Sequence, residues 1–459
     1  MAKKTINKEL TGAQDLYNFL FEACNIIRGP VSQDNFKDYI TPLLYYKRIS
    51  DVYDEETEEA LISSGGDKEY ASLPEQHRFV IPDGCHWQEV RERTENLGAA
   101  IVGAMRQIEI ANPDTLYGVL SMFSSQKWTN KAILNDSKIR DLIEHLSKRK
   151  LGNKDYPADL MGDAYEILLK KFADDSKAQA GEFYTPRSVV RLLVHILDPQ
   201  PGETVYDPAC GSGGMLIEAI RYMHDDSLCC GSIFGQEKNV VNAAIAKMNL
   251  FLHGASDFNV MQGDTLRDPK ILQGGNIAKF DCVIANPPFS LENWGATEWS
   301  SDKYKRNIYG TPSDSCGDYA WIQHMICSMS SGKGRMAVVM PQGILFRGNQ
   351  EAEIRKQLVE SDLIEAVVTL GDKLFYGTGL SPCFLIIRRM KQAHHSGRIL
   401  MIDGSKILTQ KRAQNILEEN DIDRLYSLYQ NYSDEEDYSR IVTLQEIRDK
   451  EYNLSPNRY

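Results

Sequence analysis

The sequence pattern changes near residue 200, and this change restricts the fold more strongly than any other feature of the chain. Beyond it, short runs rich in β-branched residues alternate with stretches whose apolar residues recur at helical spacing. This alternation is typical of an α/β fold with a doubly wound, mostly parallel sheet, because a parallel partner strand needs a crossover connection. The link 371–382 is too short for a helical crossover, so the strand that follows it is expected to be antiparallel. The runs that predict a seven-stranded sheet are 204–206, 232–234, 259–261, 282–285, 336–339, 366–368 and 383–387.

The flanks of this region have helical periodicity. Between residues 11 and 173, apolar side chains recur every three or four positions, as in Leu16, Leu20 and Ile27, and this spacing predicts a mainly α-helical N-terminal domain at 1–173. The sheet domain is expected at 174–403, and the charged segment 404–459 is expected to be helical. Within the first domain, the run 51–70 carries eight acidic side chains and one lysine, and we expect it to form a solvated loop.

Charge and cysteine content exclude several classes of protein. The formal net charge is −12 and the pI is near 5.4, which excludes a generally basic surface that coats nucleic acid. Any DNA binding must therefore be local or supplied by another chain. The nine cysteines are odd in number and form no CxxC pairs, which favours a reducing cytoplasm without structural zinc. No segment matches a secretory leader or a membrane span, so we expect a cytoplasmic protein without a membrane partner.

A glycine-rich turn follows the first strand. Residues 207–215, DPACGSGGM, place three glycines in four positions, which lets a backbone turn approach a ligand closely before a helix begins. The dinucleotide pattern GxGxxG is absent, because Leu216 stands where its third glycine would be. Taken alone, the motif is also compatible with a tight turn between a strand and a helix.

Two acidic residues follow the next two strands. Glu237 ends the second strand, where a carboxylate accepts both hydroxyls of a ribose that lies across the crevice. Asp264 follows the third strand, where its oxygen faces an adenine amine. Each acid alone is more often a helix cap or a surface charge. Their common position after successive strands favours a nucleoside-binding pocket.

The fourth strand leads into Asn286, Pro287, Pro288 and Phe289. Two consecutive prolines remove two backbone donors and hold the local carbonyls rigid. The Asn286 side-chain oxygen and the Pro287 carbonyl would each accept one N–H of an amine conjugated to a base ring, while a sulfonium methyl arrives in line. Phe289 would stack on the base. This tetrapeptide therefore favours methyl transfer to a weakly nucleophilic amine over an ordinary turn.

Residues 181–187, GEFYTPR, precede an apolar helix. Thr185 is expected at the N-cap and Pro186 at the first helical position. The positive end of this helix would face a carboxylate, such as the methionine end of S-adenosylmethionine. A well-capped helix without a ligand would show the same pattern.

The ordered motifs GEFYTP, DPACGSGGM, GQE, GDT and NPPF resemble those of amino-methyltransferases that place the GxFYTP element before the glycine motif. With the helical N-terminal third and the tail 453–459, the chain resembles the modification subunit of type I restriction-modification systems. The resemblance implies the sheet of an S-adenosylmethionine-dependent methyltransferase. It also implies methyl transfer from S-adenosylmethionine to the 6-amino group of an adenine flipped out of double-stranded DNA.

The same resemblance implies partners and site residues. The partners are a DNA-specificity subunit, which binds two copies of this chain, and a restriction subunit that translocates and cleaves DNA. The segment 404–459 would make subunit contacts, and no metal ligand is expected. On the matching positions, the resemblance implies that Asn286, Pro287, Pro288 and Phe289 are catalytic and that the cofactor is held by Glu182, Phe183, Tyr184, Thr185, Pro186, Arg187, Asp207, Gly211, Ser212, Gly213, Glu237 and Asp264.

Other interpretations remain open from the residues alone. The NPPF chemistry also serves cytosine or guanine amines in a solitary DNA or RNA methyltransferase, and a non-catalytic assembly scaffold would keep the same fold. The long stretch 290–317 interleaves tryptophans and tyrosine with lysines and arginine, which favours a DNA-contacting segment that orders on binding as much as a packed loop. Phe375 or Tyr376 would stack on the second face of the base, or would belong to the core.

Overall fold

The computed structural model divides into two compact units, which are described separately. The first comprises residues 1–178 with 247–256, and the second comprises 179–246 with 257–459. The residues that the structure describes are 2–116, 118–120, 125–157, 160–162, 164–165, 167–168, 171, 185–223, 232–255, 257–375, 381–411 and 414–459.

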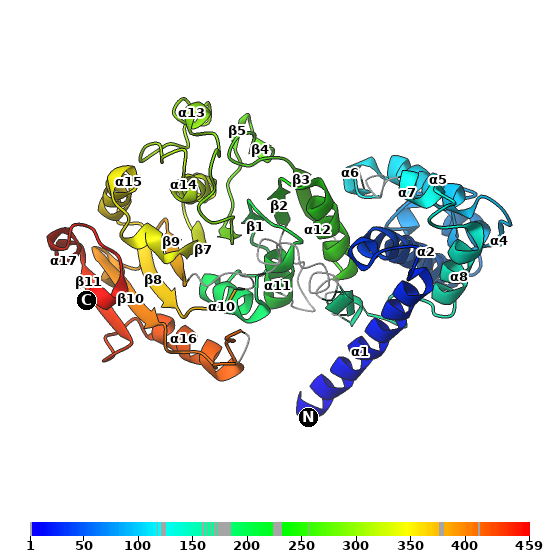
Figure 1. Cartoon of the computed structure of the whole chain (residues 1–459), viewed down its shortest axis with the longest axis horizontal. Coiled ribbons are helices and arrows are strands. Elements are labelled where there is room, and N and C mark those ends of the chain that lie inside the picture. Colours follow the sequence, from blue (N-terminus) through cyan, green and yellow to red (C-terminus); the bar gives the residue numbers. More distant parts are fainter. Residues whose placement is uncertain are drawn as a thin grey trace. The chain divides into compact units, whose positions relative to one another are not determined.

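The first unit is helical (Figure 1). Its long helices bury apolar side chains at the predicted spacing, among them Leu16, Leu20 and Ile27. Asn135 caps one of these helices, because its side-chain oxygen accepts a hydrogen bond from the Lys138 N–H at 3.0 Å. The helices and 3₁₀ turns are α1 (Ala2–Ile27), η1 (Gln33–Asn35), α2 (Lys37–Ser63), α3 (Lys68–Ala71), η2 (Pro74–Gln76), α4 (Trp87–Glu92), α5 (Leu97–Ala111), α6 (Pro113–Leu116), α7 (Ser125–Thr129) and α8 (Asp136–Leu146).

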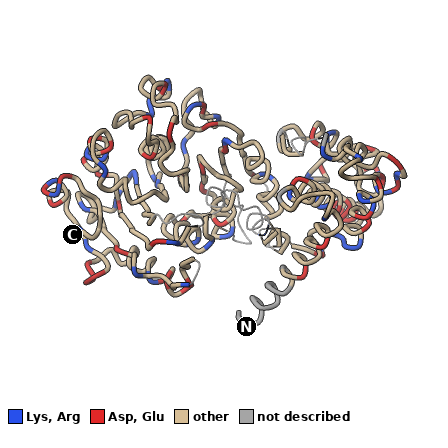
Figure 2. Tube along the Cα trace, in the orientation of Figure 1, with Lys and Arg blue, Asp and Glu red and all other residues tan. Residues whose placement is uncertain are grey.

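The predicted loop at 51–70 is wrong for most of its length, because α2 continues to Ser63. Glutamate is a good helix former, and buried Lys47 pairs with Asp51 one turn later. The acidic run therefore forms a charged face of a helix, and acidic positions gather along α2 in Figure 2.

The second unit contains a nine-stranded sheet within the described residues. Its strand order is β11-β10-β8-β9-β7-β6-β1-β2-β3, in which β9 runs antiparallel to β7 and β8, and β11 runs antiparallel to β10. The other neighbours are parallel. The strands are β1 (Val205–Asp207), β2 (Ile233–Glu237), β3 (Phe258–Gln262), β6 (Cys282–Ala285), β7 (Arg335–Pro341), β8 (Ile364–Leu370), β9 (Pro382–Arg388), β10 (Arg398–Gly404) and β11 (Ser439–Thr443), with a small separate hairpin of β4 (Leu272–Gln273) and β5 (Asn276–Ile277).

The α/β class, the mostly parallel sheet and the antiparallel β9 are confirmed, but the predicted number of seven strands is too low. The two additional strands, β10 and β11, lie at or beyond residue 398. β10 follows β9 after a short link that contains no α-helix. The alternation of strands and helices therefore gave no signal for a separate strand there. The C-terminal segment contains the expected helices α16 (Glu419–Asn431) and α17 (Leu444–Asp449), but β11 joins it to the sheet.

Helices cover both faces of this sheet (Figure 1). On one face, α10 (Arg187–Leu197) packs against α11 (Gly214–Met223) and α16. On the other face, α14 (Asp318–Ser328) and α15 (Asn349–Glu360) share a buried cluster with the strands. The remaining elements are α12 (Val240–Leu252) between β2 and β3, α13 (Ala296–Trp299), η4 (Gln342–Leu345), η5 (Ala393–His395) and η6 (Pro456–Arg458). No helix in the described part of the chain combines the length and apolarity that a membrane crossing needs.

Candidate active site

Four of the predicted site residues lie at one edge of the sheet. In the parallel register, Asp207 of β1 stands opposite Gly235 of β2, two residues before Glu237. β1 also pairs with β6, which ends one residue before Asn286, and β2 pairs with β3, which ends two residues before Asp264. Ligands of open α/β sheets bind outside the carboxyl ends of the strands, and these side chains follow those ends.

The glycine-rich turn leaves room beside this edge. Gly211 and Gly213 adopt φ values of +53° and +85°, which glycine tolerates without strain. A Cβ atom on Gly211 would meet no other atom within 4 Å, so the backbone there borders open space. The Gly213 N–H donates to the Cys210 carbonyl at 2.8 Å and closes the turn before α11 begins.

Two carboxyl groups are held by this turn. Asp207 is buried, and its Oδ1 accepts a hydrogen bond from the Ala209 N–H at 2.9 Å. Burial, together with the nearby charge of Glu237, raises the pKa of Asp207 to about 8. Glu237 accepts the Gly211 N–H at 2.9 Å and the Asn239 N–H at 2.7 Å, while burial raises its pKa. Each Glu237 oxygen retains a lone pair for a further hydroxyl donor.

Asp264 already has partners in the structure. Its Oδ2 lies 2.8 Å from the Lys238 ammonium, and its Oδ1 accepts the Leu266 N–H at 3.2 Å. A ligand amine at Asp264 would therefore compete with Lys238. The adjacent Thr265 is buried and donates its hydroxyl to the Pro208 carbonyl at 2.6 Å. This bond joins the turns after β1 and β3. Thr265 belongs to the GDT motif, but the motif alone predicted no role for it.

The Asn286 side chain has one satisfied and one unsatisfied end. Its Nδ2 donates a hydrogen bond to the Thr185 Oγ1 at 2.8 Å. Its Oδ1 is buried and has no hydrogen-bond partner. A buried carbonyl oxygen without a donor costs about 1–3 kcal/mol. The arrangement therefore presents an acceptor that a ligand N–H would satisfy.

The segment that surrounds Thr185 differs in detail from the prediction. The structure starts α10 at Arg187 and makes Pro186 its N-cap, so the expected capping role of Thr185 is wrong. The Thr185 hydroxyl bonds to Asn286 instead. Arg187 lies 3.9 Å from Glu218 of α11, so its guanidinium faces that carboxylate. Glu182, Phe183 and Tyr184 lie outside the described residues.

Aromatic and charged side chains support Phe289. Its ring centroid lies 6.3 Å from that of buried Phe375, with the planes tilted by 59°. The next residue, Ser290, donates its N–H to the Asp318 Oδ1 at 2.7 Å, and Arg347 forms an ion pair with the same carboxylate. Phe375 thus packs beside Phe289 from the strand-end loop after β8. Tyr376 lies outside the described residues.

The stretch 290–317 is packed in this structure, without DNA. Trp294 and Trp299 are each 2% exposed, and the Arg306 guanidinium lies 4.5 Å from the Trp299 ring. Buried Arg306 also donates to both Asp302 oxygens and to the carbonyls of Thr265 and Leu266. Of the two alternatives left open by the sequence, the packed loop describes Trp294, Trp299 and Arg306. In these three residues, the interleaved aromatic and cationic side chains pack against one another and against neighbouring backbone.

Arg306 also extends this network to β1. Its Nη1 donates to the His324 Nδ1 at 3.3 Å, which leaves the proton on Nε2, 3.2 Å from the Tyr206 hydroxyl. Burial and the Arg306 charge hold the pKa of His324 well below its ordinary value. The stretch after the NPPF segment is thereby tied to the strand that precedes the glycine turn.

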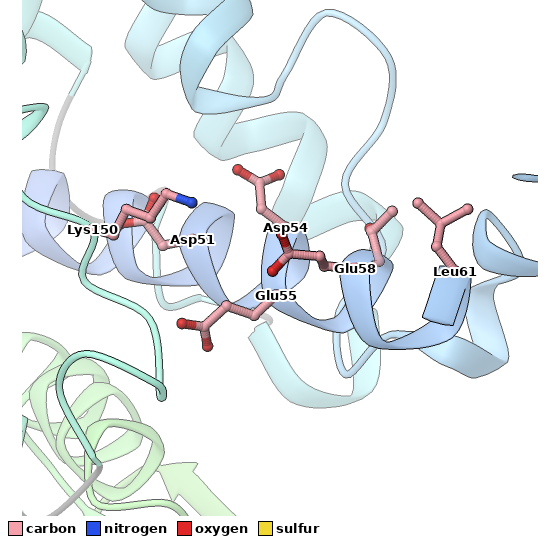
Figure 3. A pocket seen from close by; sticks show the side chains of 7 residues that line it. Asp51, Asp54, Glu55, Glu58, Leu61 and Lys150 are labelled. Atoms are coloured by element: carbon pink, nitrogen blue, oxygen red, sulfur yellow. The ribbon is translucent and has the colours of Figure 1, made fainter. Parts of the chain in front are cut away.

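Two other groups of acidic side chains are present. Cys316, Asp318 and Glu351 place ligand atoms within 4.8 Å of one another, but Arg347 forms ion pairs with both carboxylates and supplies their counter-charge. In the first unit, a cavity of about 250 Å³ contains none of the predicted site residues (Figure 3). Its lining is Asp51, Asp54, Glu55, Thr57, Glu58, Leu61 and Lys150.

The doubly wound sheet, the glycine turn and the acids after successive strands define an S-adenosylmethionine-dependent methyltransferase fold. The structure resembles the type I restriction-modification system methyltransferase subunit from Streptococcus thermophilus, with a TM-score of 0.84, 26% identity, and coverage of 97% of this chain and 99% of that one. The family model described as N-6 DNA Methylase matches residues 156–459. The chain belongs to this family.

The N-terminal third and the curated relatives agree with this assignment. The model of the HsdM N-terminal domain matches residues 16–146. The type I restriction enzyme MjaVII methylase subunit of Methanocaldococcus jannaschii is 34% identical over 438 residues, which cover 91% of this chain and 73% of the relative. The HindI methylase subunit of Haemophilus influenzae is 31% identical over 359 residues and covers 76% of this chain and 75% of the relative.

Proposed function

We propose that this protein transfers a methyl group from S-adenosylmethionine to the 6-amino group of an adenine flipped out of double-stranded DNA, as the modification subunit of a type I restriction-modification complex. Family membership and the names of the relatives support the reaction class. The observation that carries the proposal is the buried, unpartnered Asn286 Oδ1 after β6. The family description specifies an N-6 amine, which leaves the cytosine and guanine alternatives without support.

The residues at the sheet edge fit the cofactor. We assign Glu237 to the ribose hydroxyls, because both of its oxygens are already oriented by backbone N–H groups. Open space beside Gly211 gives the nucleoside a place next to the backbone. When bound, the cofactor supplies an electrophilic methyl group on a sulfonium. The other residues assigned to this pocket are Asp207, Ser212, Gly213, Asp264, Glu182, Phe183, Tyr184, Pro186 and Arg187.

The NPPF segment acts on the acceptor. The adenine amine has a delocalised lone pair, so its reactivity rises when both N–H bonds are held by acceptors. The Asn286 Oδ1 takes one of these N–H groups and the Pro287 carbonyl takes the other, which draws the nitrogen toward tetrahedral geometry. Pro288 keeps the backbone rigid. Phe289, supported by Phe375, stacks on the base.

The charge of the chain explains why it needs partners. With a net charge of −12, the protein requires phosphate contacts and base recognition from another chain. We assign these to a DNA-specificity subunit that binds two copies of this chain, partly through 404–459. A restriction subunit would supply translocation and cleavage, since the sequence has no GxxxxGK[ST] loop. Because host DNA is the substrate, the protein acts in the cytoplasm.

An Asn286→Ala variant tests the proposal. The full chain, assembled with its specificity subunit, is supplied with S-adenosylmethionine labelled on the methyl group and with genomic DNA from a host that lacks the gene. We expect transfer to adenine to fall by about 10²–10³-fold, as for the loss of one transition-state hydrogen bond. Binding of S-adenosylmethionine by the variant should be unchanged, and this measurement is the control for folding. Transfer at the wild-type rate would exclude Asn286 from catalysis.

A further inference from the structure

Thr185 and Asn286 are brought together from distant parts of the chain. Thr185 precedes α10, whereas Asn286 follows β6, and their side chains meet at 2.8 Å. The neighbouring backbone fixes Thr185 in place, since the Pro186 carbonyl accepts the N–H groups of Val189 and Val190 at 2.9 and 3.0 Å. The threonine hydroxyl is therefore held by the first turn of a helix whose other residues pack on the sheet.

We propose that Thr185 is a positioning residue that holds the Asn286 amide in place, with its oxygen left free for the substrate. This inference rests on the proposed function, because it concerns how the acceptor oxygen reaches the adenine amine. The amide group is planar and has two orientations that exchange its oxygen and nitrogen. In the observed orientation, Nδ2 donates to the Thr185 Oγ1 and Oδ1 remains free. In the opposite orientation, the threonine hydroxyl would donate to Oδ1 and occupy the acceptor.

The opposite orientation would oppose the reaction. It would direct the Asn286 Nδ2–H groups toward the N–H groups of the substrate, so that two donors face each other and no acceptor is present. Thr185 thus contributes to catalysis through Asn286 and without contact to the substrate. The resemblance assigned Thr185 to cofactor binding, whereas the structure gives its hydroxyl a partner on the acceptor side of the site.

Valine is the informative substitution, since it keeps the shape of threonine and removes the hydroxyl. In Thr185→Val, we expect kcat for DNA adenine methylation to fall by about tenfold to a hundredfold, because the acceptor loses its fixed geometry. The dissociation constant for S-adenosylmethionine should be unchanged. Thr185→Ser keeps the hydroxyl and should restore most of kcat. Ser188→Ala, in the first turn of the same helix, is the matched control and should behave like the wild type.

The outcomes separate this inference from the proposed function. A weaker dissociation constant for S-adenosylmethionine with kcat intact would overturn the positioning role and make Thr185 a cofactor ligand. Unchanged values of both would also overturn it, and so would a serine variant as slow as the valine variant. Two measurements run in parallel. If the wild type transfers no methyl group to adenine in DNA, the proposed function itself fails. If the wild type transfers it and Asn286→Ala does too, Asn286 is excluded from catalysis and the inference fails with it, whereas loss of transfer in Asn286→Ala with an unaffected Thr185→Val removes only the inference.

Discussion

Arg335 forms a buried ionic link behind the site, and its replacement by methionine should destabilise the sheet unit. Arg335 begins β7 and is 7% exposed. Its Nε donates to the Leu197 carbonyl at 2.6 Å, and its Nη2 donates to the Asp198 carbonyl, so it satisfies the C-terminal end of α10. Both Nη atoms also donate to the Glu203 carboxylate, at 3.2 and 2.7 Å. The change to methionine removes all four bonds and leaves Glu203 buried.

The expected loss is about 3 kcal/mol, the lower end of the range for removing one partner of a buried ion pair. The lower end applies because Glu203 keeps three other donors, one of which is the Cys282 thiol at 3.5 Å. The Gln200 N–H lies at 2.9 Å, and the exposed Lys333 ammonium lies at 3.4 Å. For a unit of this size, such a loss lowers the Tm by roughly 5 °C. Thermal unfolding of the whole chain, followed by circular dichroism, measures it.

The double variant Glu203→Gln with Arg335→Met tests the reasoning. Because it removes both charges together, it should recover most of the lost stability. In the wild type, burial alone would raise the pKa of Glu203, but the bonds from Arg335 lower it to about 2. The stability from this pair is therefore complete above about pH 4.5 and declines as the pH falls toward 2. A double variant as unstable as the sum of the two single variants would refute the argument.

Three further substitutions test packing at two glycines and the titration of Asp207. In α5, a Cβ on Gly98 would lie 2.0 Å from the Trp128 carbonyl oxygen, so Gly98→Ala should lower the free energy of unfolding in urea by about 3 kcal/mol. A Cβ on Gly103 would meet nothing within 4 Å, so Gly103→Ala should raise it by about 0.5–1 kcal/mol. Equal effects of the two substitutions would contradict the packing argument. Burial and Glu237 raise the pKa of Asp207 to about 8, so the wild type should lose stability by up to about 1.4 kcal/mol per pH unit between pH 4 and 8, as the unfolded chain ionises first. Asp207→Asn should reduce this slope, and an unchanged slope would exclude Asp207 as its source.

The sequence could predict those features that depend on local pattern. Asp207, Glu237 and Asn286 were placed together because each lies at or directly after the end of a strand, and the ends of parallel strands meet at the same side of the sheet. The fold class followed from the same alternation. β11 was missed because its five residues lie between charged helices and carry only a short alternating pattern.

Contacts between distant residues lay beyond such arguments. Nothing in the local sequence pairs Thr185 with Asn286, since a threonine before a proline is also a common helix cap. The same holds for Arg306, whose place among aromatic residues is compatible with either DNA binding or a packed cation. In each case the same local sequence is compatible with two roles of the residue. The tertiary structure is needed to decide between them, because it shows which distant residue the side chain contacts.

Arg306 and Asn286 are both polar side chains close to the site, but their hydrogen bonding differs. Arg306 is buried, but its nitrogens donate to a carboxylate and to backbone carbonyls, so its burial adds rigidity. Asn286 keeps one amide atom bonded and the other buried without a partner. Unsatisfied polar atoms also occur elsewhere in the chain, so burial alone identifies no site. Asn286 differs because its free oxygen follows a strand beside the glycine turn, where an N–H donor from a bound base would remove the cost of leaving it unpaired.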